Sequence, residues 1–176
     1  MKRLTRAALS SIFVLVAGGA ALLVAGSVPA QSGSEQATAK KLSASAIQIE
    51  RTEPSKDLVI PEDFRVATYE NVILQVEKTE KFQHVYRSGD RTAADVPDLV
   101  IMRLVPEAYK AGSQKEREVT TVAGSTSIKI KLTFSDKSGK VLMEKEIEGK
   151  VRFFGENLRA TYDLAKKVAA VVNESF

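Results

Sequence analysis

The side chains that could perform acid–base or nucleophilic chemistry are few and poorly grouped in this sequence. His84 is the only histidine, and the chain contains no cysteine. A general base needs a nucleophile or an orienting partner within hydrogen-bond reach, and no spacing around His84 supplies one. Ser125 follows Gly124 but lacks the second glycine of a nucleophile elbow. We therefore predict no catalytic residues, and a structural or surface role for His84.

The sequence gives equally little support to a metal or cofactor site. Without cysteine and with one histidine, only carboxylates remain as ligands. Asp90, Asp95 and Asp98 lack the alternating ligands and the turn glycine of a calcium loop, so we expect them in turns and at strand edges. Gly139 and Lys140 belong to a predicted hairpin, whereas a phosphate loop must precede a helix. We predict no metal and no cofactor.

Three acidic residues, Glu144, Glu146 and Glu148, alternate along one face of a predicted strand. Paired carboxylates can cleave glycosidic bonds. In the hairpin that we predict here, however, Lys131 lies opposite Glu144 and Lys129 lies opposite Glu146. We therefore interpret the row as a solvated, ion-paired surface, and an unfamiliar carboxylate hydrolase stays only as a minor alternative.

The first thirty residues have the layout of a bacterial signal peptide. A basic start precedes an uncharged, apolar stretch over 7–26, and Val28 and Ala30 are small enough for the positions that signal peptidase inspects. This layout predicts cleavage between Ala30 and Gln31 and export, most simply to the periplasm. About 20 apolar residues can also span a bilayer, so the alternative is a chain anchored in the inner membrane by residues 7–26.

Composition limits the anchors and partners of the chain. The absence of cysteine excludes disulfides and excludes lipid attachment directly after the signal segment. Removing residues 1–30 takes three basic residues and no acid from the net charge of +4, which leaves +1. A nearly neutral domain has no electrostatic footprint for nucleic acid. We divide the chain into a signal peptide (1–30), a small, polar, flexible lead (31–43) and one domain (44–176).

Apolar periodicity predicts the order of helices and strands. We expect an α+β two-layer sandwich with a mixed, mostly antiparallel sheet and both helices on one face. The first helix begins near Pro61, ends near Glu80 and buries a face that includes Val66. The strand over 99–105 is central, and Pro106 ends it or lies at its edge. The predicted order is β-α-β-β-β-β-α. Its elements are a strand over 44–49, the helix over 61–80, strands over 82–87 and 99–105, the hairpin strands over 128–135 and 141–153, and a last helix after Gly155 with Asn157 as its N-cap. We assign the start of the strand that follows 99–105 to residues 119–122.

The best-defined local prediction is the hairpin turn at residues 136–139. Apolar and polar residues alternate on both sides of this turn, which contains Asp, Ser and Gly. A four-residue turn sets Phe134 opposite Val141 and Leu132 opposite Met143. Moving one strand by a single residue would place apolar side chains opposite charged ones, so we expect this register.

Three stretches of the sequence, over 80–85, 94–100 and 134–141, together resemble a bacterial envelope family known as domain of unknown function 4410. They read Glu-Lys-Phe-Gln-His-Val, Ala-Asp-Val-Pro-Asp-Leu-Val and Phe-Ser-Asp-Lys-Ser-Gly-Lys-Val. The resemblance covers about residues 44–173, and the layout is similar to the N-terminal domain of TolB and to lipoprotein activators of cell-wall synthases. It implies a periplasmic accessory domain without catalysis. Many relatives are lipoproteins, whereas this chain lacks the lipid-accepting cysteine.

These observations predict an exported, non-enzymatic accessory or protein-binding domain whose partner is another envelope protein or component. The alternative is a small-molecule or lipid-binding module with its ligand between the helices and the sheet. The long connection over 109–121 is the predicted binding loop, because loops on a rigid scaffold often carry function. Its charged residues are Lys115, Glu116, Arg117 and Glu118. We expect no nucleic acid partner, and membrane contact only through an uncleaved N-terminal segment.

The export prediction is tested by the intact mass of the protein recovered from fractionated cells of its native host. We expect a periplasmic species that begins at Gln31. A full-length species in the inner-membrane fraction would contradict cleavage and would make residues 31–43 the tether of an anchored domain.

Overall fold

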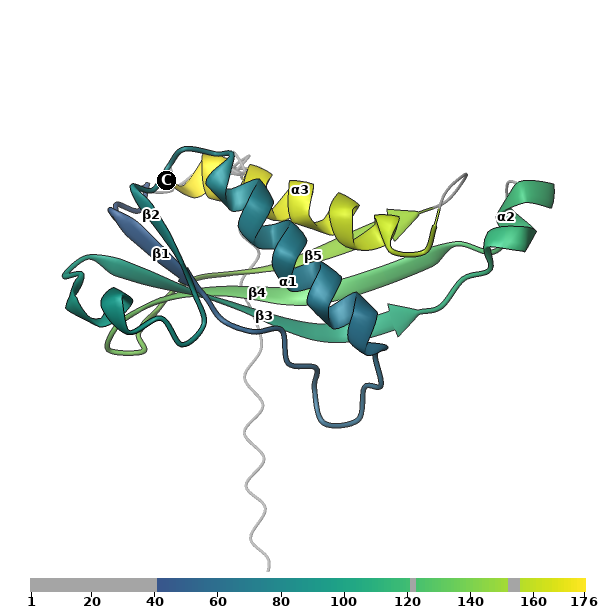
Figure 1. The fold of residues 1–176 in the computed structure, drawn as a ribbon, viewed down its shortest axis with the longest axis horizontal. Helices are drawn as coiled ribbons and strands as arrows, with labels where there is room; N and C mark the ends of the chain where they lie inside the picture. Colours follow the sequence, from purple (N-terminus) through teal and green to yellow (C-terminus); the bar gives the residue numbers. More distant parts are fainter. Residues whose placement is uncertain (1–40, 121–122, 152–155) are drawn as a thin grey trace, which may run out of the picture. The chain divides into compact units, whose positions relative to one another are not determined.

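A five-stranded mixed sheet organises the part of the chain that the computed structural model describes, residues 41–120, 123–151 and 156–176. In spatial order, its strands are β2 (His84–Arg87), β1 (Ala46–Ile49), β3 (Leu99–Lys110), β4 (Thr126–Asp136) and β5 (Val141–Val151). β1 runs parallel to β2 and β3, whereas the β3–β4 and β4–β5 pairs are antiparallel. Helices α1 (Glu62–Glu77) and α3 (Arg159–Ser175) lie side by side on one face (Figure 1). The predicted α+β architecture and order are confirmed, and a short helix α2 (Gln114–Val119) and a 3₁₀ turn η1 (Arg91–Asp95) are added to it.

The predicted signal peptide, the cleavage position at Ala30 and Gln31, and most of the lead lie outside the described residues. These predictions therefore stay as predictions. Within the ranges that the structure describes, no helix has the length and apolar character needed to cross a membrane.

Strict alternation along β4 sets the covered face of the sheet. Even-numbered residues from Ile128 to Phe134 are buried beneath the helices, whereas Lys129 and Lys131 are partly exposed on the open face. The helices fill the space above the sheet with Phe64, Val72, Val76, Leu164, Val168 and Val172. Burying one such side chain stabilises the fold by about 1.5–3 kcal/mol, so this one-sided core is the main source of stability.

Helix α1 begins after Pro61, as predicted, but ends three residues before the predicted position at Glu80. The prediction that Val66 is buried was wrong, because 52% of this residue is exposed. Val66 lies about 200° around the helix axis from the buried Phe64. The buried face follows the row of residues 64, 68, 72 and 76, together with Ile73.

Strand β3 continues through Pro106 to Lys110, so the prediction that this proline ends the strand or lies at its edge was wrong. β1 ends at Ile49, and β3 has no paired strand on that side beyond Met102. The Pro106 carbonyl accepts a hydrogen bond from the Ser55 amide there, at 3.3 Å. The missing N–H of Pro106 therefore removes no ladder hydrogen bond, and a register shift between Pro106 and Ala108 accommodates the ring.

Strands β4 and β5 form the predicted hairpin, but their pairing is shifted by two residues over most of its length. Phe134 pairs with Met143 rather than Val141, and Leu132 pairs with Lys145 rather than Met143. The shift arises at a bulge next to Phe134, where Leu142 has no partner. A shift of two keeps every side chain on its own face, so the alternating pattern alone could not distinguish the two registers.

The ion pairs predicted across the hairpin are present as diagonal contacts. Lys131 Nζ lies 3.0 Å from Glu144, and Lys129 Nζ lies 2.6 Å from Glu146. Long side chains can reach such diagonal neighbours. The interpretation of the acidic row as a solvated, ion-paired surface is confirmed.

The connection between β3 and β4 contains α2, a helix that the sequence analysis missed. Val119 is the last residue of α2 and Thr120 belongs to no strand, so the predicted strand start at 119–122 was wrong for its described part. The Ser113 hydroxyl accepts a hydrogen bond from the Glu116 amide at 3.3 Å and caps the helix. This local cap explains why the polar, charged segment turns into a helix.

The N-cap predicted for the last helix was also wrong. Helix α3 begins at Arg159, preceded by Leu158, and no side chain caps it. The Asn157 side chain instead contacts Arg117 and Thr126. These tertiary contacts compete with the capping position that local sequence favours.

Helix α3 lies very close to β5 at Gly149. A Cβ atom placed there would lie 2.3 Å from the Ala160 carbonyl oxygen and 2.6 Å from the Leu164 Cβ. Glycine is therefore the residue that allows this helix to lie against the edge strand.

We expect Gly149→Ala to lower the free energy of unfolding by about 1–3 kcal/mol, as overpacking does in a close-packed interface. Glu148→Ala is the matched control, because the Glu148 side chain lies on the open face and its ion pair is worth at most about 1 kcal/mol. Urea unfolding of both variants measures the difference. Equal stability of the two variants would contradict the close approach of α3.

Candidate functional site

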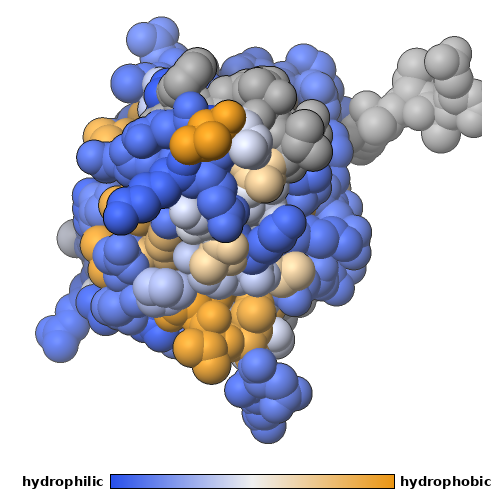
Figure 2. Space-filling model, turned by 90° about the vertical axis from the view of Figure 1, so that its right-hand side faces the viewer, coloured by the Kyte–Doolittle hydropathy of each residue, from blue (hydrophilic) through white to orange (hydrophobic). Residues whose placement is uncertain are grey.

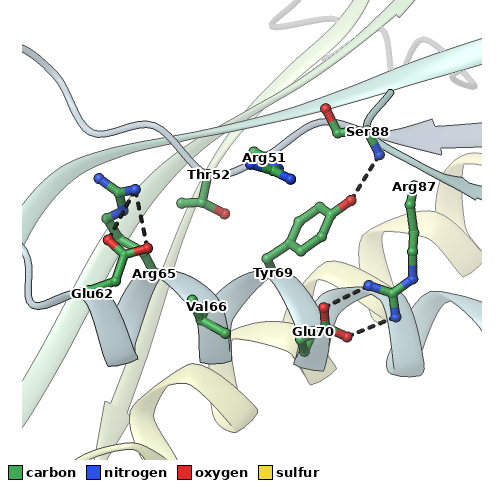
Figure 3. A pocket seen from close by; sticks show the side chains of 9 residues that line it. All are labelled: Arg51, Thr52, Glu62, Arg65, Val66, Tyr69, Glu70, Arg87 and Ser88. Atoms are coloured by element: carbon green, nitrogen blue, oxygen red, sulfur yellow. Dashed lines mark hydrogen bonds and ion pairs between the residues drawn. The ribbon is translucent and has the colours of Figure 1, made fainter. Parts of the chain in front are cut away.

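A polar hollow of about 400 Å³ lies where the parallel strands β1 and β2 end, beside helix α1 (Figure 3). The carboxyl ends of parallel strands meet at one side of a sheet, and this is where ligands bind in many open α/β sheets. The wall comes from the segment after β1, one face of α1 and the end of β2. The lining residues are Arg51, Thr52, Glu62, Arg65, Val66, Tyr69, Glu70, Arg87 and Ser88.

Tyr69 holds the three parts of this wall together. Its hydroxyl accepts a hydrogen bond from the Ser88 amide at 2.8 Å and donates one to the Ile49 carbonyl at 3.3 Å. One side chain of α1 thus fixes the ends of both parallel strands. Figure 3 shows the ring crossing the hollow between the loop and the helix.

Arg87 and Glu70 form a bidentate ion pair on the β2 side of the hollow, with contacts of 2.6 and 2.8 Å. The hydrogen bond from Arg87 lowers the pKa of Glu70, and the reciprocal bond raises the pKa of Arg87. The stabilisation is therefore present above the ordinary pKa of a glutamate and is lost as the pH falls through the lowered value. Both side chains are about half exposed, so solvent limits the pair to at most about 1 kcal/mol.

The opposite end of the hollow contains polar groups that make few contacts. Arg65 pairs with Glu62 at 3.0 Å, but its Nε is buried and has no hydrogen-bond partner among the described residues. Thr52 is only 4% exposed, and its hydroxyl oxygen likewise has no described partner. Arg51 is exposed and forms no ion pair with any residue that the structure describes. Figure 3 shows the Thr52 hydroxyl directed toward the Tyr69 side of the hollow.

A second hollow, of about 520 Å³, lies on the other side of the segment that follows β1. Its lining includes Arg103 of β3 and Glu50, which are joined by a contact of 2.6 Å. This hydrogen bond raises the pKa of Arg103. Because Arg51 and Ser88 line both hollows, the segment from Glu50 to Pro54 separates two polar surfaces.

The predicted binding residues Lys115, Glu116, Arg117 and Glu118 all belong to α2, and none of them lines either hollow. Three of them are exposed, and a role of these three in binding stays a prediction. Arg117 is buried instead, with its guanidinium donating to the Gly124 carbonyl, to Thr126 Oγ1 and, at 2.8 Å, to Asn157 Oδ1. Arg117 therefore joins α2 to the start of β4 and to the chain before α3.

The other residues considered for chemistry lie apart from one another. His84 is exposed on β2, with its ring 5.8 Å from that of Tyr86. Asp90 caps η1 through Thr92, and Asp98 accepts two hydrogen bonds from Ser45, so the expected turn and strand-edge roles are confirmed. Across the described ranges, no three histidine or acidic residues gather as metal ligands.

Several large apolar side chains of the described residues are exposed. Figure 2, which views the domain from the end that carries α2, shows apolar patches separated by hydrophilic residues. The most exposed large apolar residues of the described chain are Val59, at 88%, and Val119, at 84%. Isolated residues of this kind are normal on a protein surface, so they do not identify a docking face.

No protein-family model matches the chain, and no curated protein is significantly similar to it in sequence. Solved structures share the fold. A PelC dodecamer from Paraburkholderia phytofirmans has a TM-score of 0.57 and 8% identity, over 78% of this chain and 92% of that chain. A variant of PelC gives 0.55 and 11%, over 78% and 93%. A minor lipoprotein from Acinetobacter baumannii gives 0.46 and 9%, over 75% and 92%.

At these identities the likeness shows the fold alone. The resemblance to the family of domain of unknown function 4410 stays a prediction. The sequence analysis did not find the hollow, because its residues come from three separated segments. One signal was available: Arg51 and Thr52 come shortly after the carboxyl end of the strand predicted over 44–49.

We expect Tyr69→Phe to lower the free energy of unfolding by about 1–3 kcal/mol, because it leaves the Ser88 amide and the Ile49 carbonyl without their shared partner. The same change at Tyr162, which is 43% exposed on α3, is the control and should cost less than about 0.5 kcal/mol. Thermal unfolding followed by circular dichroism compares the two. A similar, small loss in both variants would contradict the role assigned to Tyr69.

Proposed function

We propose that this chain is an exported, non-enzymatic accessory domain of a bacterial cell envelope that acts by binding protein, and that the bound protein is a second copy of the same chain. The free outer edge of β5 is the observation that carries the proposal. The N-terminal sequence and the fold shared with PelC support the envelope setting.

The β5 edge offers main-chain groups to another strand. β5 has 11 residues, and no strand in the described part of the chain pairs with its outer side. The Lys150 amide donates to Asp163 at 2.9 Å, and the Glu148 carbonyl accepts from Lys167 at 2.8 Å. These contacts show that even-numbered residues direct their backbone groups outward, and that α3 engages these groups at Glu148 and Lys150. Further along, α3 contacts β5 through side chains only, as where Lys145 pairs with Glu174 at 3.2 Å. The outward backbone groups of Glu144 and Glu146 are therefore left for an added strand.

The glutamates of β5 disfavour two-fold antiparallel pairing of this strand with β5 of another copy. Antiparallel pairing about Glu146 would set Glu144 opposite Glu148 of the second copy. Like charges directly opposite one another destabilise a strand pair. This repulsion favours a copy that presents a different strand at this edge.

The other edge of the sheet, β2, avoids this repulsion. The Gln83 amide donates to the Ser45 carbonyl at 2.8 Å, so the odd-numbered positions face β1 and the backbone groups of His84 and Tyr86 point outward. Pairing β5 of one copy with β2 of the next is a head-to-tail contact, which generates a ring when its rotation closes. PelC, which shares the fold, is described as a dodecamer, and a ring of this kind can hold many copies.

A ligand between the helices and the sheet has less support. The facing side chains there, including Leu132, Phe134, Leu164 and Val168, are fully buried. Side chains therefore fill this layer, and the hollows described above lie at the strand ends instead.

Assembly through the two edges predicts that Glu146→Pro converts a higher oligomer into a monomer. The proline ring blocks the outward N–H of an edge position without removing a hydrogen bond to β4. Glu146→Thr removes the same carboxylate but keeps the N–H, so it should stay oligomeric. Native mass spectrometry of the full chain purified from its cell fraction gives the number of copies in each species.

A mixing experiment tests the pairing of β5 with β2. His84→Pro should also be monomeric, because it blocks the other edge. An equal mixture of Glu146→Pro and His84→Pro retains one intact edge on each variant and should yield a heterodimer. A monomeric wild-type protein, or an oligomer that Glu146→Pro leaves unchanged, would overturn the proposal.

A further inference from the structure

We infer that the hollow bounded by Arg51, Thr52, Arg65 and Tyr69 binds a small molecule that carries an oxyanion, either a carboxylate or a phosphate group. This site is separate from the proposed assembly surface. His84 and Tyr86, whose backbone the assembly uses, do not line the hollow, so the two proposals can fail independently.

The Thr52 hydroxyl is buried in the wall of the hollow. Thr52 is 96% buried, since 4% of it is exposed, and its hydroxyl oxygen has no hydrogen-bond partner among the described residues. A buried hydroxyl without a partner destabilises a fold, so valine would be the more stable residue at this position. A ligand that accepts a hydrogen bond from Thr52 gives the hydroxyl a role that folding does not require.

Hydrogen-bond donors outnumber free acceptors among the polar groups that line the hollow. The carboxylates of Glu62 and Glu70 are engaged by Arg65 and Arg87. The uncommitted groups are donors: the Thr52 hydroxyl, the Nε of Arg65 and the whole guanidinium of Arg51, which has no ion pair within the described chain. A complementary ligand must therefore offer acceptors and negative charge, and a guanidinium fork matches the paired oxygens of a carboxylate or phosphate.

The volume of the hollow and the apolar part of its wall also suit a small molecule. About 400 Å³ lies within the range that small-molecule sites occupy. The hydroxyl of Tyr69 is committed to Ser88 and Ile49, so its ring and Val66 provide the apolar part of the wall. The oxyanion thus lies near Arg51 and Thr52, and the rest of the molecule lies over the Tyr69 ring.

The test follows the arginine Nε–H signals of the ¹⁵N-labelled full chain by NMR during titration with sodium phosphate or sodium acetate. Sodium chloride at equal ionic strength is the reference. We expect saturable shifts of the Arg51 and Arg65 signals with at least one oxyanion and none with chloride. Saturation by phosphate alone assigns a phosphate group, saturation by acetate alone assigns a carboxylate, and saturation by both supports a site open to either.

Two pairs of variants separate a built site from general surface attraction. Arg51→Gln should weaken binding about tenfold or more, whereas Lys56→Gln, which removes an exposed charge from the same loop outside the hollow, should leave it unchanged. Thr52→Val should raise the thermal midpoint while weakening binding about threefold to tenfold. Thr68→Val removes another buried hydroxyl without a described partner, away from the hollow, so it should raise the midpoint without affecting binding.

Three results would overturn the inference. The first is the absence of a saturable shift with both oxyanions. The second is equal weakening by Arg51→Gln and Lys56→Gln, which would show unspecific attraction to surface charge. The third is Thr52→Val binding as tightly as the wild type, which would leave the buried hydroxyl with no part in the site.

Discussion

Helices cover only one face of the sheet, and the remaining features of the domain depend on this constraint. Residues on the covered side must be apolar, as along β4, and the next residue in each strand then faces water. The open side carries Lys129, Lys131 and their acidic partners because alternating strands place them there. The turn η1 covers a small part of this side, where Ala46, Ala93 and Leu99 form a second apolar cluster. Both hollows described above lie where β1 ends, so sites for other molecules are sought at the strand ends and edges.

Unequal strand lengths create the hollows. β1 has four residues and β3 has 12, so β1 stops while its neighbour continues. The chain after β1 must cross this step before α1 begins, and its Glu50–Pro54 segment separates the two polar hollows. Pro106 is tolerated in β3 for the same reason, because no strand of the described chain needs its N–H there. One difference in strand length therefore explains a proline within a strand and the position of the candidate site.

Sequence reasoning predicted the features that depend on local pattern and failed where tertiary contacts decide. The fold class, the order of elements, the central position of β3 and the hairpin were all predictable from periodicity. The hairpin register was not, because a bulge beside Phe134 moves the pairing by two residues and leaves the alternation intact. Asn157 has the residue type of a helix cap, yet Arg117 and Thr126 recruit its side chain. The hollow could not be predicted from the sequence for a related reason. Its walls come from segments that only the parallel pairing of β1 and β2 brings together.

The charges of the hollow divide into two groups with different roles. Arg65 is neutralised by Glu62, one turn earlier on α1, and Arg87 of β2 is neutralised by Glu70 of α1. Both arginines therefore shape the wall at little electrostatic cost. Such paired charges add little attraction for an anion arriving from water. Arg51 is different, because it follows β1 directly and no described carboxylate engages it. Folding does not require the Arg51 guanidinium at this position, and the Thr52 hydroxyl is buried without a partner among the described residues. Their juxtaposition is therefore better explained by what they can bind together than by what they contribute to folding.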